Sequence, residues 1–287
     1  MATPSSAPAP SGVPGPSGVP GLAGVPGLAG APAPGAAPTP GVPAVSPWWG
    51  RPLAETRWSL EATRLLVDPV LRGGGVPRGD GRAVVLMPGL LAGDQTLAVI
   101  AAWLRRIGYR PHVCGFVVNV DCSDRAAERV ERRVAALYAQ DGRRVALVGH
   151  SRGGHYARVI AARCPDQVSH AISLGADLRA MLSISVPTTL AVAAARRSLR
   201  ATHRARTDTC LSLDCTCPFA RDYRKAFPTG QVRLTSIYSK GDGVVRWQEA
   251  IVPEAECVEV TGSHVGLVFN RKAYRVIAHA LAQPELG

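Results

Sequence analysis

The chain has 287 residues, of which 46% are hydrophobic and 19% are charged, so it is long enough to bury a sizeable core. No apolar run reaches the roughly 18 residues that argue for a membrane span. The net charge of +12 makes nucleic acid or an anionic membrane surface a candidate partner. Because no nucleic-acid-binding module is recognisable, we expect no nucleic acid partner and a mainly solvated basic surface.

The first 47 residues differ in composition from the rest of the chain. No charged residue occurs between Ala2 and Val45, and Gly-Val-Pro-Gly recurs from Gly12, Gly18 and Gly24. Such a composition buries too little apolar surface to offset the entropy of ordering it. We therefore predict a disordered arm over residues 1–47 and one folded domain over residues 48–287. The arm lacks the features of a secretory signal, which favours a cytoplasmic location.

The folded part alternates between short apolar runs and amphipathic stretches. The spacing predicts helices over 55–71, 95–108, 123–139, 153–164, 245–251 and 267–282. It predicts strands over 82–87, 110–119, 144–149, 168–174, 232–239 and 257–260. Thr56 and Ser123 stand where helix caps are expected, and Gly108 stands where the second helix should end.

This alternation predicts an α/β fold, with a mostly parallel sheet of about six strands and helices on both faces. Right-handed crossovers bring the carboxyl ends of all the strands to one edge, where such sheets bind ligands. Residues from about 177 to 230 interrupt the alternation, and we expect them to form a cap insertion over that edge.

The predicted cap contains two clusters of unusual composition. One is a basic segment from Arg196 to Arg206, which fits a solvated helix face or a surface for lipid headgroups or an acidic partner. The other is the C-x4-C-x-C group of Cys210, Cys215 and Cys217, whose spacing does not match the usual zinc pairs. A local disulfide is the alternative, although it conflicts with a reducing cytosol. We predict no metal site and no cofactor.

A G-x-S-x-G motif stands between a predicted strand and a predicted helix. Its serine is Ser151, and the residues of the surrounding elbow are Gly149, His150 and Gly153. A strand–turn–helix setting is what a nucleophile elbow requires, and a Cβ at either glycine would clash in so tight a turn. The motif therefore predicts Ser151 as a nucleophile.

A serine nucleophile needs a base and an acid that orients the base, in the chain order nucleophile, acid, histidine. Asp242 and His264 each follow a predicted strand, so both should lie on the same sheet edge as Ser151. Asp177 follows an earlier strand and remains the alternative acid. His155 stands one helical turn beyond the elbow, where packing or exposure to solvent is the more ordinary role.

Acyl transfer also requires hydrogen-bond donors for the developing oxyanion. One should be the backbone N–H of Arg152, which follows the nucleophile. The other should come from the loop after the first strand of the sheet, where Pro88-Gly89-Leu90 begins a turn. We expect the backbone N–H of Leu90 to be this second donor.

Four segments of the chain resemble the lipase and esterase branch of the α/β-hydrolase superfamily, in particular compact bacterial hydrolases that carry G-H-S-R-G-G. They are residues 88–93, 149–154, 238–245 and 262–266. The resemblance implies hydrolysis of a small-molecule ester or lipid through an acyl-enzyme intermediate, without a cofactor. The sequence departs from many of these lipases at Pro88, where they have histidine.

Two other functions are compatible with the same residues. A thioesterase or an acyltransferase would use the same triad on a different substrate or acceptor. A non-catalytic scaffold could keep the fold and bind partners through the arm and the basic cap, although such a protein would be free to lose its triad.

Overall fold

The structure is a computed structural model, and it describes residues 55–179, 181, 190–191, 193–195, 197–198 and 217–286. The predicted arm over residues 1–47 lies outside the described residues. Most of the predicted cap insertion also lies outside them, including Cys210, Cys215 and all of the basic segment except Arg197 and Ser198.

No helix within the described ranges is both long enough and apolar enough to cross a membrane.

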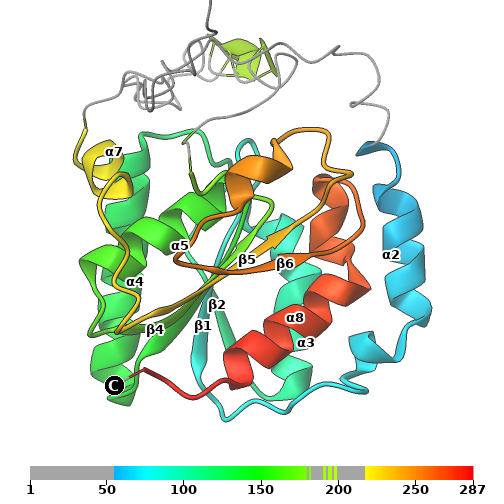
Figure 1. Cartoon of the computed structure of the whole chain (residues 1–287), viewed down its shortest axis with the longest axis horizontal. Coiled ribbons are helices and arrows are strands. Elements are labelled where there is room, and N and C mark those ends of the chain that lie inside the picture. The colour runs from blue at the N-terminus through cyan, green and yellow to red at the C-terminus, as the bar shows by residue number, and fades with distance from the viewer. Residues whose placement is uncertain are drawn as a thin grey trace, which may run out of the picture. The chain divides into compact units, whose positions relative to one another are not determined.

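The core is a six-stranded sheet in which every strand pair is parallel (Figure 1). The strands are β1 (Ala83–Met87), β2 (Arg110–Val113), β3 (Val145–His150), β4 (Val168–Leu174), β5 (Arg233–Tyr238) and β6 (Glu256–Glu259). Their order in the sheet is β2-β1-β3-β4-β5-β6. This arrangement confirms the predicted fold class, including the number of strands. All six carboxyl ends lie along one edge, as the parallel order requires.

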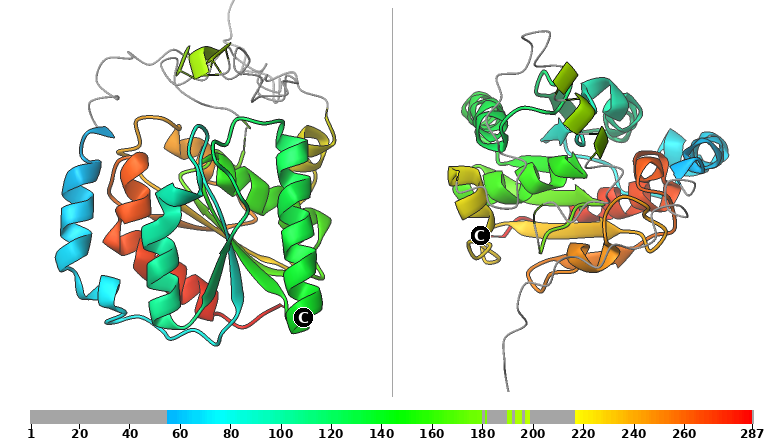
Figure 2. Two further views of the ribbon diagram at one scale, coloured as in Figure 1. Left: turned by 180° about the vertical axis from the view of Figure 1, so that it is seen from behind. Right: turned by 90° about the horizontal axis from the view of Figure 1, so that it is seen from above.

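Helices pack on both faces of this sheet (Figure 2). The α-helices whose bounds the structure describes are α2 (Trp58–Val67), α3 (Ala98–Ile107), α4 (Ser123–Asp141), α5 (Arg152–Arg163), α7 (Pro218–Tyr223) and α8 (Arg271–Ala282). Short 3₁₀ helices are η1 (Pro69–Arg72), η2 (Asp94–Leu97), η3 (Trp247–Ala250) and η4 (Val265–Phe269). Val85 and Met87 of β1 pack in the cluster that holds α4, α5 and α7. Val84 and Leu86 pack with α3 and α8, and burial on both faces explains why these strands are continuously apolar.

Some local predictions need correction. The strand predicted over 110–119 ends at Val113, because the chain turns at Gly115 and the following residues bond to a neighbouring loop instead of the sheet. Ser123 is the first residue of α4 and not its cap, since its hydroxyl accepts a hydrogen bond from the Arg152 guanidinium. The helix predicted over 245–251 is only the short 3₁₀ helix η3.

The other helix boundaries differ less from the prediction. Gly108 ends α3 in the left-handed conformation, as expected. Thr56 does not cap α2, whose N-cap residue is Arg57. The predicted last helix is divided at Asn270, whose side chain accepts hydrogen bonds from the backbone N–H groups that begin α8.

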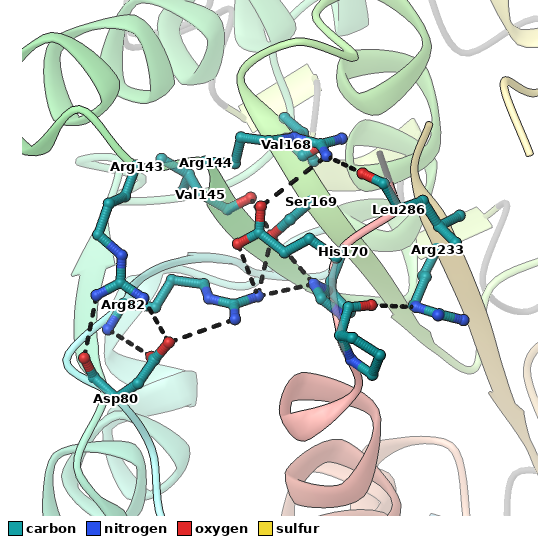
Figure 3. Close-up of polar contacts among 12 residues, drawn as sticks. Asp80, Arg82, Arg143, Arg144, Val145, Val168, Ser169, His170, Arg233 and Leu286 are labelled. Carbon is teal, nitrogen blue, oxygen red and sulfur yellow. Dashed lines mark hydrogen bonds and ion pairs between the residues drawn. The ribbon is translucent and has the colours of Figure 1, made fainter. Parts of the chain in front are cut away.

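An arginine-rich network lies at the amino ends of the strands (Figure 3). The predicted site residues follow the carboxyl ends of the strands, at the opposite end of the sheet. Arg144 Nη1 donates to the carbonyl of Leu286, and Arg233 Nε donates to the carbonyl of Pro284, each at 2.7 Å. Arg82 is buried and donates to His170 Nδ1 at 2.9 Å. The contacts of Arg144 and Arg233 hold the C-terminal segment at the amino ends of β3 and β5.

Candidate active site

Ser151 lies alone between β3, which ends at His150, and α5, which begins at Arg152. Its backbone has φ 52° and ψ −121°, and only Leu91 among the other described non-glycine residues has a positive φ. The Ser151 N–H donates to the carbonyl of Leu174 at 2.7 Å, which fixes the turn against β4. Such a conformation costs about 1–3 kcal/mol and persists only where the surrounding structure enforces it. A strained serine at a strand–helix junction is the geometry that the motif predicts.

The glycines of the elbow are sterically required. A Cβ at Gly149 would lie 2.0 Å from the carbonyl oxygen of Gly153, and a Cβ at Gly153 would lie 2.1 Å from that of Met87. Both contacts are far shorter than van der Waals separation and involve backbone atoms, which cannot move independently. The start of α5 therefore packs directly on the ends of β3 and β1.

Asp242 and His264 form a buried hydrogen-bonded pair at the carboxyl ends of β5 and β6. His264 Nδ1 lies 2.7 Å from Asp242 Oδ2, so the imidazole donates and the carboxylate accepts. Asp242 Oδ1 accepts from the backbone N–H groups of Val244 and Val245, each at 2.8 Å. Burial opposes the charged imidazolium, but the charge and hydrogen bond of Asp242, together with the charges of Glu55 and Asp177, raise the pKa of His264 above its ordinary value of 6.5.

Gly175, which the sequence analysis did not single out, lets the backbone after β4 approach this pair. It has φ 61°, and a Cβ there would lie 3.3 Å from both Asp242 Oδ2 and His264 Nδ1. It would also lie 2.6 Å from a Leu267 methyl carbon. A glycine directly after a buried strand of a parallel sheet is the signal that could have identified this position.

His150 connects the elbow to the loop that carries His264. Its Nε2 lies 3.0 Å from the carbonyl oxygen of His264, and the two imidazole rings are 4.9 Å apart. Burial, with the nearby His264, lowers the pKa of His150 to about 3, so the ring is neutral and donates through Nε2–H. The structure thus brings the residue beside Ser151 into direct contact with the predicted base.

The alternative acid, Asp177, has a different partner. His155 Nε2 is hydrogen-bonded to Asp177 Oδ1 inside the protein, and both side chains are buried. The Tyr223 hydroxyl donates to the Asp177 carbonyl. The carboxylate that is hydrogen-bonded to His264 is that of Asp242, and His155 has a packing role rather than exposure to solvent.

The loop after β1 crosses the elbow, where the second oxyanion donor was predicted. A Cβ at Gly89 would lie 3.2 Å from Ser151 Cβ and 3.1 Å from His150 Nδ1. The Leu91 N–H donates to the carbonyl of Asn119 at 3.1 Å, and Leu91 has φ 64°. Leu90 therefore stands in the turn next to the nucleophile.

Asn119 holds this loop in place, a role that the sequence analysis missed by assigning the residue to a strand. It is fully buried, and its Nδ2 donates to the carbonyl of Pro88 at 2.8 Å. Its backbone N–H donates to the carbonyl of Ala92 at 2.8 Å. Its Oδ1 accepts from Arg152 Nη1 at 3.1 Å and from the Tyr156 hydroxyl at 2.9 Å. Asn119 thus links the loop after β1 to the start of α5.

No group of three or more histidine, cysteine or acidic side chains within the described residues is arranged to hold a metal ion. Cys217, the one member of the cysteine cluster within them, accepts a hydrogen bond from Ala220 N–H at the start of α7. The pairing of the other two cysteines lies outside the described residues.

The chain is similar in structure to several solved hydrolases, whereas no model of a known protein family matches its sequence. The mature lipase BlEst2 of Bacillus licheniformis aligns with a TM-score of 0.53 and 17% identity, over 72% of this chain and 94% of the lipase. The propeptide form of the same lipase aligns with a TM-score of 0.54 and 16% identity, over 74% of this chain and 53% of the lipase. A thioesterase domain from the curacin biosynthetic pathway aligns with a TM-score of 0.50 and 17% identity, over 71% of this chain and 92% of the thioesterase domain. With its parallel sheet and flanking helices, the chain has the α/β-hydrolase fold.

Proposed function

We propose that the chain is a serine hydrolase that cleaves carboxylic esters of small molecules or lipids through an acyl-enzyme intermediate. Ser151 is the nucleophile, His264 the general base and Asp242 the acid that orients it. The observation that carries this proposal is the position of the strained Ser151 on the sheet edge where His264 is hydrogen-bonded to Asp242. The likeness to the Bacillus licheniformis lipase supports the same fold for this chemistry.

Acylation uses the tautomer of His264 that the hydrogen bond to Asp242 selects. With its proton on Nδ1, the imidazole has an unshared electron pair on Nε2, which accepts the hydroxyl proton of Ser151 as Oγ attacks the ester carbonyl. The carbonyl π electrons move to oxygen, and the backbone N–H groups of Leu90 and Arg152 stabilise the resulting oxyanion. Collapse expels the alkoxide, which takes the proton from His264 Nε2.

Deacylation repeats these steps with water in place of Ser151. His264 removes a proton from water, the hydroxide attacks the acyl carbonyl, and the protonated imidazole returns a proton to Ser151 Oγ as the acid is released. Asp242 stays ionised and stabilises the imidazolium that forms in both halves.

The raised pKa of His264 sets the acid side of the pH profile. The base must be unprotonated, so hydrolysis falls as pH decreases through the pKa of the free enzyme. Because the carboxylates around His264, Asp242 first among them, outweigh the effect of burial, this fall occurs at a pH above the ordinary histidine value of 6.5.

A fluorescent fluorophosphonate probe tests the proposal on the full chain, with Ser151→Ala as the comparison. We expect the wild type to be labelled and to hydrolyse a p-nitrophenyl ester, and the variant to do neither while its thermal melting is unchanged. A folded wild type without labelling or turnover contradicts the proposal and favours the scaffold alternative. A parallel acyl-thioester assay tests the thioesterase alternative, which the likeness to the curacin thioesterase domain makes worth including.

A further inference from the structure

The loop that carries His264 begins the short helix η4, and its backbone N–H groups need partners from outside that helix. His264 is the N-cap residue of η4 and makes no side-chain cap. The first N–H groups of a helix have no intrahelical acceptor, and leaving them buried without partners is costly. Gly266 N–H donates within the loop, to Ser263 Oγ at 3.1 Å. The acceptors for the other N–H groups come from a segment more than 200 positions earlier in the sequence.

Glu55, which stands just before α2, accepts hydrogen bonds from both catalytic loops. Its Oε1 accepts from the His264 N–H at 2.9 Å and from the Gly243 N–H at 3.0 Å. Its Oε2 accepts from the Val265 N–H at 2.8 Å. Gly243 directly follows Asp242. The Glu55 carboxylate therefore joins the loop that carries Asp242 to the loop that carries His264.

Glu61, within α2, binds Ser263, the residue before His264, in the same way. It is 9% exposed, and its Oε1 accepts from the Ser263 N–H at 2.8 Å while its Oε2 accepts from the Ser263 hydroxyl at 2.9 Å. A Cβ at Gly266 would overlap Glu61 Oε2 at 1.2 Å, so the loop is packed directly on this carboxylate. Hydrogen bonds from N–H groups to an ionised acceptor are the stronger kind.

We propose that Glu55 and Glu61 form a carboxylate clamp in which Glu55 is a positioning residue for the catalytic histidine, holding the His264 and Asp242 loops together through their backbone N–H groups. This inference rests on the proposed function of His264 as a base. In this role Glu55 acts through the backbone of the His264 and Asp242 loops.

The clamp also affects the proton equilibrium of His264. The charged or titratable groups that face this imidazole are Asp242 from the loop after β5, His150 from β3, Asp177 after β4 and Glu55 before α2. Burial lowers the pKa of His264, while Asp242, Glu55 and Asp177 raise it. His150 is neutral because its own pKa is about 3. Removal of the Glu55 charge should therefore lower the pKa of His264, whereas a purely structural role would leave it unchanged.

The test is Glu55→Gln in the full chain, assayed for hydrolysis of a short p-nitrophenyl ester from pH 5 to pH 9. The amide keeps one acceptor oxygen, but its NH₂ group faces an N–H group and weakens the clamp. We expect kcat to fall by about 10- to 100-fold, since a small misplacement of a catalytic group has an effect of that size. KM should change little, and the acid side of the kcat/KM profile should move to lower pH.

Glu128→Gln is the matched control, because it is the same substitution at an exposed position of α4. It should match the wild type in rate and pH profile. If Glu55→Gln also matches the wild type in both, the clamp inference is wrong. If instead the wild type shows neither probe labelling nor turnover, it is the proposed function that fails.

Glu55→Asp keeps the test decisive if Glu55→Gln does not fold. The aspartate retains the charge but withdraws the carboxylate by one methylene group from the three N–H donors. If the clamp positions His264, Glu55→Asp should have a lower kcat than the wild type. The acid side of its kcat/KM profile should lie closer to that of the wild type than the acid side of Glu55→Gln does. A folded Glu55→Asp variant with unchanged kcat overturns the proposal.

Discussion

Asn119 and Pro88 are joined by a hydrogen bond of 2.8 Å from the buried side-chain amide to the backbone carbonyl. Pro88 begins the loop that crosses Ser151, and the other side of the same amide accepts from the Arg152 guanidinium. The two proposed oxyanion donors, Leu90 and Arg152, are therefore held in register by one side chain. An oxyanion hole whose two donors come from separate loops needs such a connection, because each donor must lie within a few tenths of an ångström of its productive position.

Asn119→Asp separates the donor function of this amide from its acceptor function. The carboxylate still accepts from Arg152 and Tyr156, but it cannot donate to Pro88. We expect kcat to fall by about 10- to 100-fold through displacement of the loop, with KM affected less. Steady-state kinetics on a p-nitrophenyl ester measure this change. Ser123→Ala, which removes a different acceptor of Arg152, should retain most of the activity, and equal losses in both variants would contradict the assignment.

Replacement by asparagine should have different effects at Asp242 and Asp177, the two buried carboxylates near His264. Asp242→Asn removes the charged acceptor of the imidazole and should lower kcat by about 10⁴-fold, because the amide favours the wrong tautomer of the histidine in a triad of this kind. Asp177→Asn breaks the pair with His155 and should lower the unfolding free energy by about 1–3 kcal/mol while kcat stays near that of the wild type. Kinetics and thermal denaturation of both variants distinguish the two roles. Loss of kcat in Asp177→Asn alone would make Asp177 the acid.

The steric requirement at the elbow can be measured as stability. Gly149→Ala places a Cβ 2.0 Å from a backbone oxygen, so the start of α5 must shift. Overpacking in a core typically costs about 1–3 kcal/mol, and contact with backbone should bring this variant to the upper end or beyond. Gly230→Ala is the control, because a Cβ there meets nothing within 4 Å. Chemical denaturation compares the two, and equal midpoints would show that the turn relaxes without strain.

His170 makes stability depend on pH at the amino edge of the sheet (Figure 3). Burial, followed by the charge of Arg82, lowers its pKa from 6.5 to about 4. Between these values the unfolded chain binds a proton that the folded protein does not, so the unfolding free energy falls as pH decreases from about 6.5 to about 4. The loss from this residue is on the order of 3 kcal/mol. Denaturation at a series of pH values measures it, and His170→Asn should flatten the curve over this range.

His150 adds to the same acid sensitivity, because burial also lowers its pKa, to about 3. The His170→Asn curve should therefore retain part of its slope. A variant with an unchanged curve would show that His170 does not remain neutral in the folded protein.

The features that depend on local sterics and on strand order could be predicted from the residues alone. Continuous apolar runs alternating with amphipathic stretches predicted the parallel sheet, because strands buried on both faces must be apolar throughout. The glycines around Ser151 predicted the elbow, since a turn that tight excludes a Cβ. Asp242 and His264 could be placed on the same edge because each stands in the loop that follows a strand.

Which groups become partners across long separations in the chain depends on how the folded elements pack. Asp177 and Asp242 both follow strands, and packing alone pairs the first with His155 and the second with His264. Asn119 lies beyond the end of β2 because its hydrogen bonds go to a loop and to α5, a choice that no local pattern encodes. Glu55 meets the N–H of His264 across 209 positions, where the identity of an acceptor depends on how α2 packs against η4 and not on the residues beside either one.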